Sequence, residues 1–139
     1  MPTSAELLVD TSAAVPFLLS SHEAHATTYA ALRSHRLGLS GHAAFETYSV
    51  ITRLPGTARV SPAMAARILK HNFPQTAYLS TKRAASLLPA LATHSVSGGA
   101  VYDALVGATA VEHGCRLATR DQRAARTYAD LGVHVLLID

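Results

Sequence analysis

Four acidic residues lie where a carboxylate could do chemistry. In the run LLVDTS, a short apolar segment stops at Asp10 and the chain passes at once into a helical stretch. Glu46 borders the apolar stripe of GHAAFETYSVITRL, and Asp103 lies in the first turn of the helix predicted from GGAVYDALVGATAVEHG. Asp121 stands between a strand and a helix in LATRDQRA. Because hard divalent ions prefer carboxylate oxygens, the four acids together predict a metal site.

Each acid also has a structural explanation. Asp10 and Asp121 precede predicted helices, where aspartate commonly serves as the N-cap. For Asp121 taken alone, capping is the stronger interpretation, whereas the two hydroxyl residues that follow Asp10 could cap the first helix in its place. The interaction of Asp103 with a helix N-terminus is worth about 0.3–1 kcal/mol, which is small beside the cost of burying a charge. Glu46 fits a surface acid as well as a ligand.

Short apolar runs alternate with helical segments along the chain. Strands are expected at Leu7–Asp10, Leu37–Ser40, Arg116–Thr119 and Val133–Ile138, with a minor strand at Tyr78–Ser80. Unbroken apolar strands separated by helices are typical of a parallel sheet that is covered on both faces. No linker, repeat or low-complexity tract interrupts the pattern, so we expect an α/β fold in a single domain over residues 1–139.

Composition and charge restrict the classes of protein to which the chain could belong. Hydrophobic residues make up 49% of the chain and charged residues 15%, which excludes disorder and favours a homodimer or another partner that covers apolar surface. The chain has 12 Lys and Arg and 9 Asp and Glu, which gives a net charge of +3. If four of the acids line one pocket, the rest of the surface carries 12 basic and 5 acidic residues, a net charge of +7. Such a surface suits a polyanion. The candidate phosphate contacts are Arg59, Arg67, Lys70, Lys82, Arg83, Arg116, Arg120, Arg123 and Arg126.

The chain has one cysteine and no long apolar run. Cys115 alone cannot form an internal disulfide or a thiolate metal cluster. No segment approaches the roughly 18 apolar residues of a membrane span, and the first ten residues do not look like a signal peptide. We therefore expect a cytoplasmic protein that does not interact with membranes.

The motifs quoted above, in this order, resemble the PIN-domain ribonuclease toxins of the VapC type. LLVDTSAAVPFLL, AAFETYSVITRL, VYDALVGATAVEHG and LATRDQRA carry the resemblance over essentially the whole chain. It implies a three-layer α/β/α fold with a central parallel sheet. It also implies cleavage of RNA by a metal-activated water, with Mg²⁺ or Mn²⁺ as cofactor, and inhibition by a small VapB-like antitoxin.

The resemblance also assigns roles to individual residues. The family's catalytic and metal-binding acids fall on Asp10, Glu46, Asp103 and Asp121. Ser12 takes the place of the hydroxyl beside the first acid, and Thr119 that of the threonine before the last, as supporting residues. The chain departs from its relatives directly after the last acid, where Gln-Arg-Ala replaces a bulky apolar residue.

Two other function classes are compatible with the same residues. A phosphatase or phosphotransfer domain could use Asp10 as its nucleophile, although DTS lacks the second aspartate of a DxD arrangement. A non-catalytic RNA- or protein-binding module could keep the fold without metal. A trapped phospho-Asp10 intermediate would favour the first of these classes, and a failure to detect divalent metal binding by calorimetry would favour the second.

Overall fold

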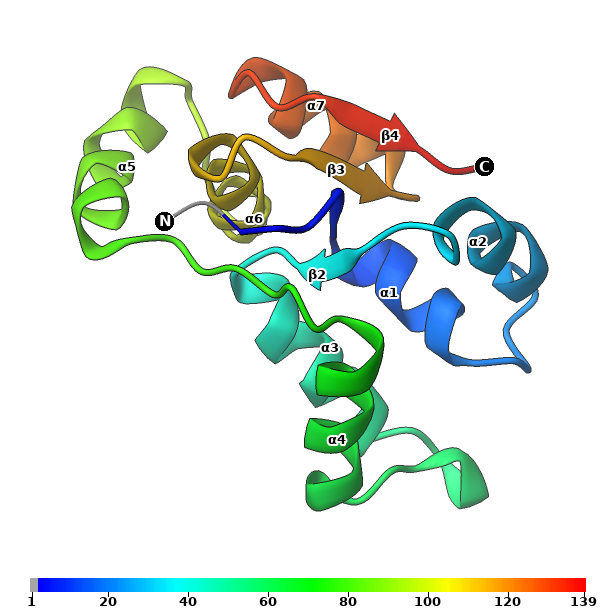
Figure 1. Cartoon of the computed structure of the whole chain (residues 1–139). Coiled ribbons are helices and arrows are strands. Elements are labelled where there is room, and N and C mark those ends of the chain that lie inside the picture. The colour runs from blue at the N-terminus through cyan, green and yellow to red at the C-terminus, as the bar shows by residue number, and fades with distance from the viewer. Residues whose placement is uncertain (1–2) are drawn as a thin grey trace.

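A four-stranded parallel sheet forms the centre of the molecule, seen in a computed structural model that describes residues 3–139. Its order is β2-β1-β3-β4 (Figure 1). The strands are β1 Leu7–Val9, β2 Leu37–Leu39, β3 Arg116–Thr119 and β4 Val135–Leu137. Each lies within a segment that the sequence predicted to be a strand.

Seven α-helices surround the sheet in this part of the chain. They are α1 Thr11–Leu18, α2 His25–Leu32, α3 His42–Thr52, α4 Pro62–Asn72, α5 Thr81–Thr93, α6 Ala100–Glu112 and α7 Gln122–Asp130. A short 3₁₀ turn, η1 Gly56–Ala58, lies between α3 and α4. None of the helices in residues 3–139 is long and apolar enough to cross a membrane.

The alternating side chains of β1 define the two faces of the sheet. Leu7 and Val9 join a core that includes side chains of α1, α2 and α4, whereas Leu8 joins a second core with α6 and α7. All three are fully buried, as expected for a central strand whose successive side chains point to opposite faces. Helices therefore cover both faces, and the predicted three-layer α/β/α architecture is confirmed (Figure 1).

The minor strand predicted at Tyr78–Ser80 is wrong. The chain pairs with the edge of the sheet earlier, where the amides of Gln75 and Ala77 donate to β2 carbonyls and Ala77 forms an isolated parallel bridge with Ser40. This approach depends on Gly38, because a Cβ at that position would lie 2.0 Å from the Gln75 carbonyl oxygen. A glycine in the middle of β2 thus allows a second backbone to cover the edge.

Candidate active site

The carboxyl ends of β1 and β3 lie side by side at the point where the chain reverses its direction of winding. From β1 the chain moves to β2 on one side, and β3 then pairs with β1 on the other side. In such sheets the crevice outside the carboxyl ends of these strands is the usual ligand site. Asp10 follows β1, Thr119 is the last residue of β3 and Asp121 comes two residues later, so three predicted site residues meet at this crevice.

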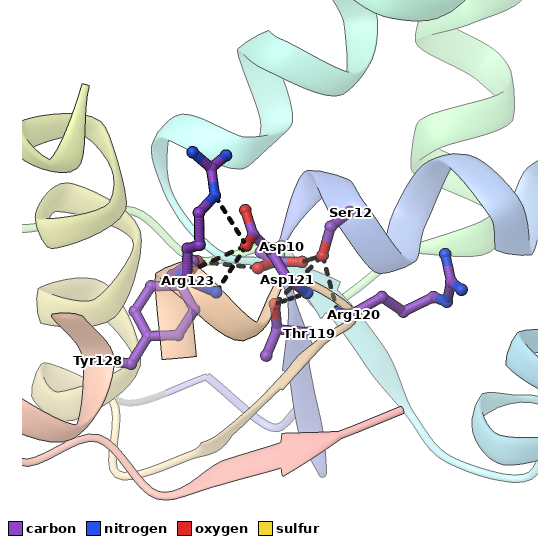
Figure 2. Close-up of polar contacts among 8 residues, drawn as sticks. Asp10, Ser12, Thr119, Arg120, Asp121, Arg123 and Tyr128 are labelled. Carbon is purple, nitrogen blue, oxygen red and sulfur yellow. Dashed lines mark hydrogen bonds and ion pairs between the residues drawn. The ribbon is translucent and has the colours of Figure 1, made fainter. Parts of the chain in front are cut away.

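Asp10 is the most buried acid of the site and is held by protein donors. Its side chain is 5% exposed. Oδ1 accepts hydrogen bonds from the Ser12 hydroxyl at 2.7 Å and the Ala13 amide at 3.2 Å, while Oδ2 accepts from the Tyr128 hydroxyl at 2.8 Å (Figure 2). Burial raises the pKa of Asp10, and the hydroxyls of Ser12, Thr119 and Tyr128 oppose that rise.

The expectation that the hydroxyl residues after Asp10 could cap the first helix in its place is wrong. Asp10 is the N-cap of α1, because its side chain accepts from the Ala13 amide while its own backbone is extended. The Ser12 hydroxyl does not cap α1. It contacts the Asp10 carboxylate and the loop after β3 instead. A single aspartate therefore both begins the helix and presents its carboxylate at the sheet edge.

Ser12 and Thr119 connect Asp10 to the loop after β3. Ser12 Oγ accepts from the Arg120 amide at 2.8 Å and lies 3.1 Å from Thr119 Oγ1. Thr119 Oγ1 in turn accepts from the Asp121 amide at 3.1 Å. Only the backbone of Arg120 contacts this network, since its side chain extends away from Asp10 (Figure 2). The two hydroxyls predicted to support the acids thus fix the loop that carries Asp121.

Asp121 caps α7 as its sequence context predicted. Its Oδ1 accepts from the amides of Arg123 at 2.9 Å and Ala124 at 3.2 Å. The Arg123 Nε lies 3.9 Å from the same oxygen, and its side chain is 91% exposed. Oδ1 therefore accepts the hydrogen bonds that begin α7, whereas Oδ2 takes no part in these capping contacts.

The pKa of Asp103 reflects the negative charges of the other three acids. Asp103 lies half-buried in the first turn of α6. Burial and the negative charges of Asp121, Asp10 and Glu46 together raise its pKa to about 6, against a smaller opposing effect of Arg123. Like charges raise a carboxyl pKa only when they are near, so the four predicted acids share one field.

Glu46 reaches the cluster because the start of α3 is fixed against α6. The Ser40 hydroxyl donates to the Val106 carbonyl of α6 at 2.7 Å, and Gly41 follows with a φ of 52°. The ring of His42 stacks on Tyr102 of α6 with centroids 5.0 Å apart, and its Nε2 lies 3.9 Å from Glu46 Oε1. Glu46 itself is only partly buried, with 43% of its side chain exposed.

An open, polar hollow lies beside two of the acids. Its volume is about 420 Å³. The residues that line it are Gly99, Ala100, Asp103, Asp121, Arg123 and Thr127. A lining that combines two acids with an exposed guanidinium suits an anionic ligand that binds together with a cation.

A model of a known protein family matches most of this chain. The family model described as PIN domain matches residues 7–130. The chain belongs to the PIN-domain family.

The PIN-domain assignment agrees with relatives along nearly the whole chain. Ribonuclease VapC27 of Mycobacterium tuberculosis (strain ATCC 25618 / H37Rv) is 48% identical over 131 residues, which are 94% of this chain and 96% of the relative. Ribonuclease VapC40 of the same organism is 43% identical over 131 residues, or 93% of this chain and 96% of the relative. The resemblance to VapC proteins inferred from the sequence motifs is confirmed.

Solved structures give the same fold. The crystal structure of FitAcB from Neisseria gonorrhoeae matches with a TM-score of 0.70 at 20% identity, covering 94% of this chain and 96% of that one. Mycobacterium tuberculosis VapC20, described as a sarcin–ricin loop cleaving toxin, matches with a TM-score of 0.68 at 19% identity, covering 86% and 93%. At these identities the likeness concerns the fold.

The carboxylate oxygens available in this PIN domain are suitable ligands for a hard divalent ion. VapC-type PIN ribonucleases generally depend on a divalent metal. The four acids offer only oxygen ligands, and their mutual repulsion, visible in the raised pKa of Asp103, is what a cation would relieve. Within residues 3–139, no three His, Cys, Asp or Glu side chains are gathered closely enough to hold an ion as they stand. The acids therefore form an open cluster.

Tyr128 is a residue of the site that motif analysis missed. It lies on α7, and it shares that helix's buried face with Ala124, four residues earlier. The only local signal was this spacing in an otherwise polar helix, which predicts a core contact. Its bond to Asp10 joins residues 118 positions apart, and no local pattern encodes such a contact.

Proposed function

We propose that this chain is a divalent-metal-dependent endoribonuclease of the VapC type, the toxin of a type II toxin–antitoxin module. One observation carries the proposal: the hydroxyls of Ser12 and Thr119 join Asp10 to the loop of Asp121, and Asp121 lines one hollow together with Asp103. Two curated relatives that cover nearly the whole chain are named as ribonucleases. The proposed substrate is RNA and the proposed cofactor is Mg²⁺ or Mn²⁺.

The roles of the acids follow from how each is held. Asp10 and Asp103 are the proposed principal ligands, since one is fixed at the sheet edge and the other lies in the shared field. Glu46 approaches from α3, and Asp121 has one oxygen committed to the α7 amides. A divalent ion at these carboxylates would lower the pKa of a bound water and offset charge that develops on a phosphodiester.

The other residues of the site bind and orient. Ser12 and Thr119 hold the Asp121 loop against Asp10, so the acids of the two strands stay in register. Arg123, an exposed residue of the hollow's lining, is placed to contact a phosphate of the RNA. Its guanidinium also limits the repulsion that Asp103 experiences.

The phosphotransfer alternative is less consistent with the geometry. Hydrogen bonds from the protein to both oxygens of Asp10 weaken the carboxylate as a nucleophile, although Oδ2 has only one donor and keeps a lone pair that an ion could use. The non-catalytic alternative leaves unexplained why four carboxylates should be kept in mutual repulsion. The nuclease accounts for both features.

We also propose a VapB-like antitoxin as partner, and a homodimer. Structural neighbours include FitAcB from Neisseria gonorrhoeae and VapBC2 from Rickettsia felis bound to a DNA fragment from their promoter. An apolar hollow of about 320 Å³ between α3 and α4 offers a docking surface. Its lining includes Phe45 and Tyr78, which are 63% and 55% exposed.

Cleavage of RNA with and without metal tests the function. Purified protein is incubated with total tRNA and ribosomal RNA in Mg²⁺, in Mn²⁺ or in EDTA, and the new 5′ ends are mapped. We expect defined cuts with metal only, no cuts from Asp10→Asn or Asp103→Asn, and normal cuts from Asp130→Asn, a matched control at the exposed end of α7. Full activity of both site variants would refute the proposal.

A further inference from the structure

Tyr128 is a buried phenol that contacts the site without having a part in the proposed reaction. Its side chain is 1% exposed, and its hydroxyl donates to Asp10 Oδ2 at 2.8 Å (Figure 2). A core tyrosine can satisfy its hydroxyl with any nearby carbonyl. This one is aimed at a proposed metal ligand, which calls for an explanation beyond packing.

The bond from Tyr128 holds the side of Asp10 that local structure leaves free. Ser12 and Ala13 donate to Oδ1, and both belong to the helix that Asp10 itself caps. These two donors hold Oδ1 and oppose a turn about the Cβ–Cγ bond from one side, but neither of them contacts Oδ2. The donor on α7 holds Oδ2, so the carboxylate plane is held at both oxygens.

The ring of Tyr128 is itself seated by α6. A Cβ at Gly107 would lie 3.0 Å from Tyr128 Cδ1 and 3.1 Å from Val133 Cγ2, so the glycine lets the ring pack close to the helix. Gly107 lies one helical turn after Asp103 and on the same side of α6. Tyr128 thus touches Asp10 with its hydroxyl, packs on the helix of Asp103 with its ring, and belongs to the helix that Asp121 caps.

We infer that Tyr128 is a positioning residue for the metal site, whose hydroxyl holds Oδ2 and helps to fix the plane of the Asp10 carboxylate that would bind a divalent ion. The inference rests on the proposed function. It is a general rule that a donor behind a ligating carboxylate orients it, and loss of such a donor typically costs about 10–100-fold in metal affinity or activity. An ionised carboxylate only accepts hydrogen bonds, so the phenol is the donor in its bond to Asp10.

Equilibrium binding of Mn²⁺ without RNA provides the test. The full chain, Tyr128→Phe and Tyr29→Phe are titrated with Mn²⁺ and followed by the electron paramagnetic resonance signal of the free ion. Tyr29 is a matched control because it is 40% exposed and lies on α2, stacked on Phe17 and away from the acids. We expect Tyr128→Phe to weaken Mn²⁺ binding by about tenfold or more and Tyr29→Phe to leave it unchanged.

RNA cleavage separates positioning from general damage. For Tyr128→Phe we expect half-maximal cleavage to need more Mn²⁺, in proportion to its weaker Mn²⁺ binding. At saturating Mn²⁺, kcat should be largely recovered and the KM for RNA unchanged. Wild-type Mn²⁺ affinity in Tyr128→Phe, with an active parent, would overturn the inference and leave the proposed function standing. A parent that cleaves no RNA with metal would overturn the proposed function, whatever the variant binds.

A measurement on the parent protein covers the case in which Tyr128→Phe does not fold. With all five tyrosines labelled with ¹³C at Cζ, the signal of Tyr128 is assigned by elimination, using phenylalanine variants of the four exposed ones. We expect Mg²⁺ to shift the Tyr128 signal at the same concentrations at which it binds. A Tyr128 signal that Mg²⁺ does not move while it binds would refute the inference.

Discussion

Replacing Asp103 by asparagine should stabilise the metal-free protein and abolish its activity. The carboxylate pays an electrostatic penalty, because burial and the charges of Asp121, Asp10 and Glu46 raise its pKa from an ordinary 3.8 to about 6. An acid with a raised pKa binds a proton more readily in the folded state than in the unfolded state. The folded state therefore loses stability as the pH rises from about 4 to about 6, and asparagine removes that loss.

The structure gives the size of the effect. At about 1.36 kcal/mol per pKa unit, the rise corresponds to an upper bound of about 3 kcal/mol. Asp103 is only half-buried, so solvent screening reduces the expected gain to about 1 kcal/mol. For a domain of this length, about 1 kcal/mol raises Tm by roughly 3–4 °C.

Thermal unfolding in EDTA at pH 7.5 and at pH 4.5 measures this gain. Asp103→Asn should melt above the parent at pH 7.5 and nearly with it at pH 4.5, where the parent's Asp103 is protonated. Glu112→Gln on the same helix is a control of opposite sign, because hydrogen bonds from Ser80 lower the pKa of Glu112 and its charge therefore stabilises the fold. An Asp103→Asn variant that melts lower than the parent at pH 7.5 would refute the argument.

Three further predictions concern the metal, the cap and the sheet edge. Mn²⁺ should raise Tm more at pH 7.5 than at pH 5, since the ion binds ionised carboxylates and Asp103 has a pKa of about 6; equal increments by calorimetry would contradict this. Asp121→Asn should reduce cleavage but keep the melting temperature, because asparagine is also a good N-cap. Asp121→Ala should reduce cleavage and also lower the free energy of unfolding in urea by about 1 kcal/mol. Gly38→Ala should destabilise by about 3 kcal/mol in the same assay, against little change for Gly99→Ala, whose Cβ would meet nothing within 4 Å.

Much of the fold could be predicted because its signals are local. Short apolar runs separated by helical segments predict strands, and β1 and β3 end at acid-containing segments in the sequence as they do in the structure. The start of α4 at Ser61-Pro62 and the end of α6 before Gly114 follow from backbone preferences of neighbouring residues. Such preferences act within a few positions and need no knowledge of the rest of the chain.

The site could be predicted only as a set of residue types. The acids and the hydroxyls of Ser12 and Thr119 are visible as motifs, but their separation in the sequence says nothing of distance. The expectation about the α1 cap failed because one side chain can cap a helix and face a crevice at once, which depends on its rotamer. The minor strand failed because Gly38 admits the chain before residue 78.

The sequence by itself determined the strands, the helices and the acids that follow them, because each depends on the chemistry of neighbouring residues. Tertiary structure alone decided that β1 lies beside β3, that the start of α3 is fixed on α6, and that Tyr128 reaches Asp10 across 118 positions. It also decided the pKa of Asp103. Desolvation and Coulomb repulsion depend on distances through space, and only the packed chain sets these.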